Sequence, residues 1–407
     1  MIPILIKDGT LLTGGKAVKA DILIRDGKIA YVGPDLNQES CESDGSIESN
    51  ILTINAQGKY VAPGFIDMHT HGGGGKDFMD GDLESYRTAL RLHGSHGTTL
   101  MFPTTLSSTS ESLFDAVRAY RRVKDVVSGH DGAPEGSAMG GLHLEGPYFA
   151  MSKKGAQDPR YLRNPDPQEY MALIEEAGGD IARWSLAPEL PGALEMARRL
   201  SERGVVMAMG HTDATFEECE AAVEAGFTHM THFFSCMSSI VKNGIDRKAG
   251  VVEYGYYNDE VTVEIIGDGV HVPASMLKLV YKLKGPQGVA LITDSVRPAG
   301  LPEGRYILGS ETEGVEVVVE DGVAKLADRS SLAGSVATMD MVVRTVRRLT
   351  GLPLEEVVRS ATETPARIMG LADRKGSLKE GFDADIVIFD DEVNMSEVII
   401  GGRRMQL

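Results

Sequence analysis

The chain has few cysteines and no long apolar run. Its three cysteines, Cys41, Cys219 and Cys236, are odd in number and show no paired spacing. This pattern excludes a disulfide-stabilised scaffold and predicts a reducing compartment, the cytoplasm. The N-terminal stretch MIPILIKDGT contains a charge and a glycine. We therefore expect neither a signal peptide nor a membrane span there, and no other stretch is long enough for one.

Basic residues are scarce relative to acidic ones. Lys and Arg number 41 against 59 Asp and Glu, which gives a net charge of -18. This balance argues against nucleic acid as the main ligand, and an anionic substrate would need positive charge placed locally. The 407 residues suffice for one large α/β domain with a small accessory domain.

Both ends of the chain have β-type patterns. ILIKDGTLLTGG and ADILIRDGKIAYVG are apolar runs broken by the hairpin signals Asp-Gly and Gly-Gly. GSLKEGFDADIVIFD and SEVIIGGRRM, near the C-terminus, also have strand character. We predict that residues 1–60 and 372–407 together form a small β-sandwich domain, with the acidic residues 35–50 as a surface loop.

Between these ends, residues 61–371 alternate strand-type and helix-type segments. Helices are expected at 191–204, where Pro191 fits the first turn and Gly204 the stop, and at 273–284. Eight strands separated by helices predict an α/β fold, a (β/α)8 TIM-like barrel, with a doubly wound open sheet as the alternative. The expected strands cover residues 61–68, 98–103, 139–145, 183–188, 205–210, 227–232, 261–266 and 288–294.

Residue types that bind metals follow several of these strands. The carboxyl ends of parallel strands meet at one face of a barrel, so such residues can converge from distant parts of the chain. Neutral imidazole and carboxylate are the ligands of hydrolytic metal sites, which predicts a metal-dependent hydrolase. The set comprises His69 and His71 in FIDMHTH, Glu145 in GLHLEGP, His211 in VVMAMGH, His232 in FTHMTH and Asp294 in VALITD.

Particular roles follow from position. His69 and His71 are two residues apart on a strand, so their side chains point the same way and can share one ion. Asp294 can take a proton from the attacking water and return it to the leaving group, unless it is a helix N-cap. His271, in DGVHV, can polarise a substrate carbonyl, with a surface histidine as the alternative.

The remaining histidines are interpreted as structural. These are His93, His96, His130 and His229, while His143 is expected to support the site from the strand of Glu145. The four glycines at 72–75 predict either an anion-binding nest or a flexible loop. The proline-containing residues 153–168 are expected to cover the mouth of the barrel.

A series of longer stretches, in order across residues 61–371, resembles the amidohydrolase superfamily. Within it, the resemblance is to the deacetylases of acetamido sugar phosphates. It implies hydrolysis of an acetamide to acetate and an amino sugar phosphate by a distorted barrel. The stretches are APGFIDMHTHGG, LHLEGPYFAMSKKGAQDP, GHTDAT, THFFSCM, DRKAG, DGVHV, TDSVRPAGLPEGRYILG, LAGSVATMD and ATETPARIMGL.

The resemblance also implies roles for individual residues. Glu145, His211 and His232 would be the primary metal ligands, and His69 and His71 would hold a second metal. One or two divalent ions per subunit are implied, zinc or iron, with manganese or cobalt as alternatives.

Asp294 would be the catalytic acid and base, and His271 a carbonyl and sugar contact. The resemblance implies a homodimer in which Arg247 reaches the substrate phosphate in the neighbouring site. Further substrate contacts map onto Ala156, Gln157, Ser235, Cys236, Asp268, Leu332, Ala333 and Gly334.

The chain departs from the superfamily branch in the sugar-binding wall. The branch usually has His at the position of Gln157 and Asn-Ala at Ser235-Cys236, and the run between His232 and Arg247 also differs. The reaction type is therefore better supported than the substrate. The alternatives are an amidohydrolase acting on an unphosphorylated N-acyl sugar, an N-acyl amino acid or a cyclic amide, and a non-catalytic protein that binds sugar phosphates.

Overall fold

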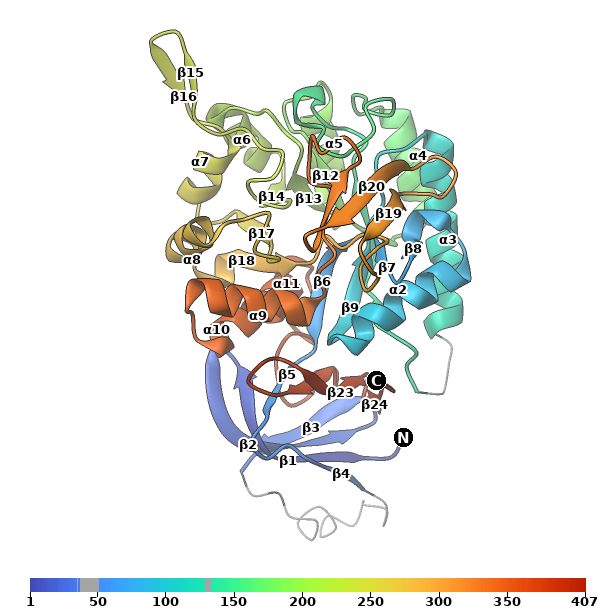
Figure 1. The fold of residues 1–407 in the computed structure, drawn as a ribbon, viewed down its shortest axis with the longest axis vertical. Helices are drawn as coiled ribbons and strands as arrows, with labels where there is room; N and C mark the ends of the chain where they lie inside the picture. Colours follow the sequence, from blue (N-terminus) through green and yellow to red (C-terminus); the bar gives the residue numbers. More distant parts are fainter. Residues whose placement is uncertain (35, 37–50, 129–132) are drawn as a thin grey trace.

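The computed structural model describes residues 1–34, 36, 51–128 and 133–407, and the statements below concern these residues. Figure 1 shows a β-sheet built from both chain ends, which lies against a larger α/β body. The acidic segment expected to be a surface loop, residues 35–50, falls outside the described residues except for Leu36.

Strands from both termini form one eight-stranded sheet in the order β24-β23-β22-β5-β1-β2-β3, with β4 paired to β1. Alternating apolar residues, among them Ile4, Ile6, Ile22 and Ile388, are buried together in its core. Because hydrogen bonds join these strands into a single sheet, the predicted two-sheet sandwich is not confirmed. The strands are β1 (Ile4–Thr13), β2 (Lys16–Arg25), β3 (Lys28–Gly33), β4 (Leu52–Asn55), β5 (Tyr60–Pro63), β22 (Ile386–Phe389), β23 (Met395–Ile400) and β24 (Arg403–Arg404).

The larger body is organised around parallel strands. A six-stranded sheet has the order β11-β12-β13-β14-β17-β18, and a three-stranded sheet has the order β10-β9-β6. The strands are β6 (Phe65–Thr70), β9 (Thr98–Pro103), β10 (Ala138–Met139), β11 (Leu142–Glu145), β12 (Ile181–Leu186), β13 (Val206–Met209), β14 (Phe227–Met230), β17 (Thr262–Ile266) and β18 (Val289–Ile292).

Isolated parallel bridges connect these two sheets at both edges. Thr70 pairs with Ser295 beyond β18, and Thr104 beyond β9 pairs with His143 in β11. The buried Asp67 carboxylate adds to the first junction, because it accepts a hydrogen bond from Thr293 Oγ1 at 2.6 Å. The parallel strands therefore form a curled sheet, whereas an open, doubly wound sheet would leave its edges apart.

Helices lie outside the curled sheet (Figure 1). The helix expected at 191–204 is shorter, and the one expected from 273 continues to Gly288 across a break at Gly285, where φ is +65°. Among the described helices, none has the length and apolar character needed to cross a bilayer. The helices are α2 (Leu83–Ser95), α3 (Ser110–Ser128), α4 (Pro167–Ala177), α5 (Ala193–Ser201), α6 (Phe216–Glu224), α7 (Val251–Tyr257), α8 (Ala274–Gly288), α9 (Met339–Thr350), α10 (Leu354–Ala361) and α11 (Glu363–Ile368).

Several short elements lie in the loops that follow the parallel strands. The sequence patterns did not predict them. A hairpin of β15 (Val241–Asn243) and β16 (Asp246–Lys248) projects away from the body in Figure 1. A three-stranded antiparallel sheet lies near the centre of that view. Its strands are β19 (Gly304–Leu308), β20 (Val315–Glu320) and β21 (Val323–Leu326). The remaining elements are β7 (Gly72–Gly73), β8 (Lys76–Asp77), η1 (Phe78–Asp80) and η2 (Met151–Lys153).

Candidate active site and metal centre

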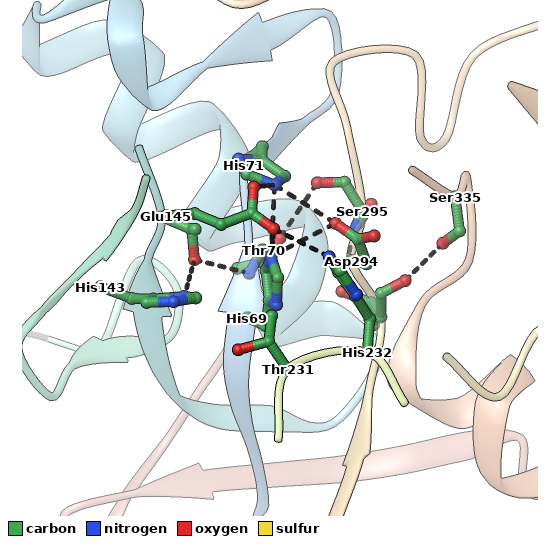
Figure 2. A network of polar contacts seen from close by, with 12 residues as sticks. His69, Thr70, His71, His143, Glu145, Thr231, His232, Asp294, Ser295 and Ser335 are labelled. Carbon is green, nitrogen blue, oxygen red and sulfur yellow. Dashed lines mark hydrogen bonds and ion pairs between the residues drawn. The ribbon is translucent and has the colours of Figure 1, made fainter. Parts of the chain in front are cut away.

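The metal-type residues converge at the carboxyl ends of the parallel strands. Figure 2 shows His69, His71, Glu145, His232 and Asp294 pointing toward one another. His69 lies in β6 and Glu145 ends β11, while the others follow their strands within two residues. All of these side chains, and His211 beyond β13, are buried.

Three of these residues have left-handed backbone conformations. The φ angles are +47° at His211, +29° at His232 and +48° at Asp294. Residues other than glycine rarely adopt this conformation, and it persists only where the surroundings hold it. The chain therefore turns sharply after β13, β14 and β18, and these turns direct the three side chains inward.

The ligand atoms form two groups that share Glu145. His69, His71 and Glu145 make one group, and Glu145, His211 and His232 make the other, with the atoms of each group within 4.8 Å of one another. Nε2 of His69 lies 3.3 Å from Nε2 of His71, and Nε2 of His232 lies 3.0 Å from Nε2 of His211. Glu145 Oε1 lies 3.1 Å from His232 Nε2, and Oε2 lies 3.5 Å from His71 Nε2.

This donor set fits a divalent cation. Two ligands about 2.0–2.1 Å from one tetrahedral ion are separated by about 3.4 Å, close to the spacing seen here. His69 Nδ1 donates to Glu264 Oε1 at 2.7 Å, and His211 Nδ1 donates to the Lys153 carbonyl at 2.8 Å. Nδ1 of each of these imidazoles therefore carries a proton, so Nε2 is the nitrogen that faces the centre and can bind a metal ion.

The carboxylates of the centre are held in their charged form. Burial would raise the pKa of Glu145, but His69, His211 and His232 outweigh burial and hold that pKa well below its ordinary value. Burial acts on Asp294 in the same direction, and His69 and His71 lower its pKa below the usual range. Asp294 Oδ1 lies 3.2 Å from His71 Nε2, so this carboxylate is placed to accept a proton beside the metal-type residues.

His271, which follows β17, is held in a fixed orientation. Its Nδ1 donates to Asp268 Oδ2 at 2.7 Å, and the backbone N–H groups of Val270 and His271 donate to Asp268 Oδ1. Burial would lower the pKa of His271, but the bond to Asp268 outweighs burial and raises it. With Nδ1 donating to Asp268, Nε2 of His271 can donate a hydrogen bond in the doubly protonated imidazolium form, which the raised pKa favours.

A cavity of about 210 Å³ opens onto this centre. Gln157 links its wall to the ligand groups, because its Nε2 donates to Glu145 Oε2 at 2.6 Å and its Oε1 accepts from the backbone N–H of Ser107. Twelve of the residues predicted from sequence line the cavity: His71, Glu145, Ala156, Gln157, His211, Ser235, His232, Cys236, His271, Asp294, Leu332 and Gly334.

Four predicted residues are not in the cavity wall. His69 is fully buried and contacts the centre from below the wall, and Ala333 is buried in an apolar cluster with Val296 and Leu308. Asp268 contacts His271, as described above, and thereby holds the orientation of that side chain. Arg247 is exposed on β16 and is not among the residues that line the cavity.

Sequence reasoning missed some residues of the site. The cavity wall includes Leu106, Ile266, Val296, Leu308 and Ser331. Aliphatic and hydroxyl side chains of this kind are common throughout a protein, so a single sequence does not mark them as residues of a site. Glu264 was also missed, although a carboxylate within the apolar strand TVEII was a visible anomaly.

Glu264 and Arg183 form a fully buried ion pair beneath the centre, with Arg183 Nη1 2.5 Å from Glu264 Oε2. Burial would raise the pKa of Glu264, but Arg183 and His69 outweigh burial and hold it well below its ordinary value. A full negative charge therefore lies behind His69.

Of the histidines interpreted as structural, some lie away from the centre and others lie next to it. His93 is buried and its Nε2 donates to the Gly72 carbonyl, while His96 pairs with Asp340 at 3.1 Å. His229, in β14, is buried against Glu264. His143 contacts Ser185 and lies edge-on to the His69 ring, as expected of a supporting residue, and His130 lies outside the described residues.

Comparisons with known proteins agree with this architecture. The model of the amidohydrolase family matches residues 60–405. The chain is 34% identical to the N-acetylglucosamine-6-phosphate deacetylase of Lysinibacillus sphaericus over 96% of this chain and 94% of that one. It is 31% identical to the enzyme of that name from Homo sapiens, over 96% and 93% of the two chains.

Solved structures give the same result. A mutant N-acetyl-D-glucosamine-6-phosphate deacetylase from Mycobacterium smegmatis, in complex with N-acetyl-D-glucosamine-6-phosphate, matches with a TM-score of 0.86 and 32% identity over 99% of both chains. The N-acetylglucosamine-6-phosphate deacetylase of Pasteurella multocida matches with a TM-score of 0.88 and 26% identity over the full length of both chains.

The curled parallel sheet and the imidazole and carboxylate groups at its strand ends are features of metal-dependent amidohydrolases. Together with the match over residues 60–405, they show that the chain belongs to the amidohydrolase family. The relatives and structures described above are all N-acetylglucosamine-6-phosphate deacetylases.

Proposed function

We propose that this protein is a metal-dependent hydrolase that removes acetate from N-acetylglucosamine 6-phosphate, or from a close N-acetylhexosamine phosphate. The other product is the amino sugar phosphate. One observation carries the proposal: two ligand groups sharing Glu145 converge beside Asp294 at one cavity. Relatives that cover nearly the whole chain, and whose name gives this activity, support the choice of substrate.

Glu145, His211 and His232 would hold one divalent cation, and His69 and His71 with Glu145 would hold a second. Imidazole and carboxylate ligands suit zinc and iron, and they also accept manganese and cobalt. Such a cation supplies Lewis acidity, which lowers the pKa of water and polarises a carbonyl group.

Asp294 would move the proton. Its ionised carboxylate takes a proton from water as the water oxygen attacks the acetyl carbon, and it then gives that proton to the nitrogen as the C–N bond breaks. The low pKa of Asp294 keeps it ready to act as the base. His271, in the imidazolium form that Asp268 favours, would donate from Nε2 to the acetyl oxygen as negative charge develops there.

The phosphate would be bound by Arg247 of a second copy of the chain. The residues that line the cavity include no lysine or arginine, so within the described part of one chain the cavity wall supplies no cation for an anionic group. Arg247 is exposed on the projecting β15–β16 hairpin, which could reach a neighbouring subunit. A homodimer would therefore complete the site with a planar, bidentate cation.

A second candidate is deacetylation of an unphosphorylated N-acyl sugar. The same absence of lysine and arginine from the cavity wall favours it, as do Gln157, Ser235 and Cys236 at positions where related deacetylases usually have other residues. In this reading the chemistry at Asp294 is unchanged, and the sugar is bound by neutral groups alone.

The same proposal extends to the organisation of the chain. The bridges that join β6 to β18 and β9 to β11 support a closed (β/α)8 barrel over residues 61–371. The sheet of both termini supports a separate small domain of residues 1–60 and 372–407. The unpaired Cys219 and Cys236 favour a reducing compartment, the cytoplasm.

The test is acetate release by purified protein before and after metal removal. Metal content would be measured first, then the protein would be stripped with a chelator and reloaded with zinc, iron, manganese or cobalt. We expect acetate and hexosamine phosphate in equal amounts, lost on stripping and restored by metal. A metal-replete protein that releases no acetate from any N-acetylhexosamine phosphate would rule out the proposal.

A further inference from the structure

The fully buried ion pair of Glu264 and Arg183 has no place in the proposed reaction, yet it lies directly behind the metal-type residues. Both side chains have no solvent exposure, although they come from different strands, β17 and β12. Removing two charges from water has a large desolvation cost before their mutual attraction is counted. Apolar side chains would fill the same space without this cost, so packing alone does not explain why a charged pair is found here.

Glu264 contacts both ligand groups with one oxygen. Its Oε1 accepts from His69 Nδ1 at 2.7 Å and from the backbone N–H of His232 at 2.9 Å. His69 belongs to the first group and His232 to the second. A single carboxylate oxygen therefore connects two residues that lie 163 positions apart in the sequence and that would bind the metals.

The other oxygen of Glu264 is occupied by cationic and neutral donors. Oε2 accepts from Arg183 Nη1 at 2.5 Å and from His229 Nε2 at 3.3 Å. Arg183 is itself fixed, because Nη1 also donates to the Met68 carbonyl at 3.3 Å and Nη2 donates to Thr231 Oγ1 at 3.0 Å. Met68 and Thr231 are the residues immediately before His69 and His232. The pair therefore holds the backbone of both ligand positions.

We infer that Glu264 and Arg183 are positioning residues that set the tautomer of His69 and the separation of the two ligand groups. The carboxylate keeps a proton of His69 on Nδ1, which makes Nε2 the nitrogen available to a metal ion at the centre. Arg183 neutralises the negative charge of Glu264. Its hydrogen bonds also connect the pair to Met68 in β6 and to Thr231 directly after β14. The inference rests on the proposed metal centre.

Zinc affinity in matched variants tests this role. Glu264→Gln preserves shape and removes the charge, and the double variant Glu264→Gln with Arg183→Met removes both charges. Single variants leave one buried charge unpaired and are expected to unfold more easily, whereas the double variant regains stability. We expect the stable double variant to bind Zn²⁺ about 10–100-fold more weakly than the native protein, the usual effect of losing a carboxylate behind a ligating histidine.

A control removes a largely buried ion pair outside the centre. Lys375 and Asp385 pair at the small sheet with side chains 11% and 10% exposed, and Lys375 also lies 3.0 Å from Asp383. Lys375→Met with Asp385→Asn should leave zinc affinity unchanged, which separates loss of an ion pair in general from loss of this one. A stable Glu264→Gln, Arg183→Met protein with native zinc affinity and stoichiometry would overturn the inference.

A second measurement needs no variant of the pair. Nitrogen NMR of the native protein labelled at histidine, with His69 assigned by comparison with His69→Asn, reports which ring nitrogen carries the proton. We expect a protonated Nδ1 on His69 with and without zinc, and a His69 whose Nδ1 carries no proton would refute the inference. The two hypotheses can therefore fail separately. Native protein that binds no zinc would rule out the proposed metal centre, whichever nitrogen of His69 is protonated.

Discussion

At the scale of single residues, Asp294 has the most defined task. It follows β18, lies 3.2 Å from His71 Nε2 and is held ionised by the neighbouring imidazoles. Asp294→Asn keeps the shape but cannot accept a proton, so turnover should fall by about two to four orders of magnitude while fold and bound metal are retained. Steady-state acetate release by metal-replete protein measures this, and near-native turnover would remove Asp294 from the mechanism.

His69 and His71 are the residues that would bind a second metal ion. They complete a ligand group that shares Glu145 with the group of His211 and His232. In His69→Ala with His71→Ala, bound metal should fall from two equivalents to one without loss of the fold. Metal analysis of protein supplied with excess ion is the measurement. If the native protein never exceeds one equivalent, the second site does not exist.

The candidate ligands could be predicted from sequence because each residue type stands at the end of an apolar strand. The buried residues that hold these ligands in place, Glu264 and Arg183, could not be predicted from sequence. Glu264 meets Arg183 from 81 positions away, and the other residues that bond to Glu264 in the described structure, His69, His229 and His232, are also distant in sequence. A buried carboxylate in TVEII was visible as an anomaly, but its purpose depends on which strands become neighbours in the curled sheet.

At the scale of elements, the β15–β16 hairpin carries the proposed phosphate contact. Arg247 and Lys248 are both exposed on β16, and neighbouring residues of a strand point to opposite faces. Arg247→Ala should raise KM for the phosphorylated sugar by roughly one to three orders of magnitude, since it removes a charge-assisted contact. It should scarcely change KM for the unphosphorylated sugar.

Lys248→Ala is the matched control, because it removes one positive charge from the other face of the same hairpin. Its KM should stay within about twofold of native, as is usual for an exposed charge. Equal effects of the two variants would mean that the hairpin acts through net charge alone. No effect of either would place the phosphate elsewhere.

Most strands were predictable at this scale, and the insertions were not. The strand expected at 98–103 coincides with β9, and the others overlap their predicted ranges, because continuous apolar runs bounded by polar turns are typical of buried parallel strands. β15 and β16 are three residues long, β16 consists of exposed polar residues, and β19 contains the exposed Arg305, so these strands lack that pattern. Their positions depend on surfaces that form only after the larger sheet has curled.

At the scale of the whole molecule, buried histidines make stability depend on pH. Burial lowers the pKa of His93 to about 4 from an ordinary 6.5. Between these values the unfolded chain takes up a proton that the folded chain does not, so the free energy of unfolding falls as pH falls through this window. By pH 5 the loss from His93 should be about 2 kcal/mol, at about 1.4 kcal/mol per pH unit below 6.5.

Urea unfolding at pH 7 and pH 5 measures this loss. His93→Gln has no group that titrates in the window, so the difference in unfolding free energy between the two pH values should be smaller than in the native protein. An unchanged difference would show that His93 is not the source. The contributions of other buried histidines cancel in the comparison, because they are present in both proteins.

The most direct test of the central claim is the ratio of kcat/KM for acetate release from N-acetylglucosamine 6-phosphate and from N-acetylglucosamine, measured with one preparation of metal-replete protein. If the protein is a deacetylase of the sugar phosphate with Arg247 on the phosphate, the phosphorylated sugar should be favoured by at least about tenfold, the scale of one charge-assisted contact. Equal values for the two sugars, or a preference for the unphosphorylated one, would contradict the account and leave only the deacetylase chemistry.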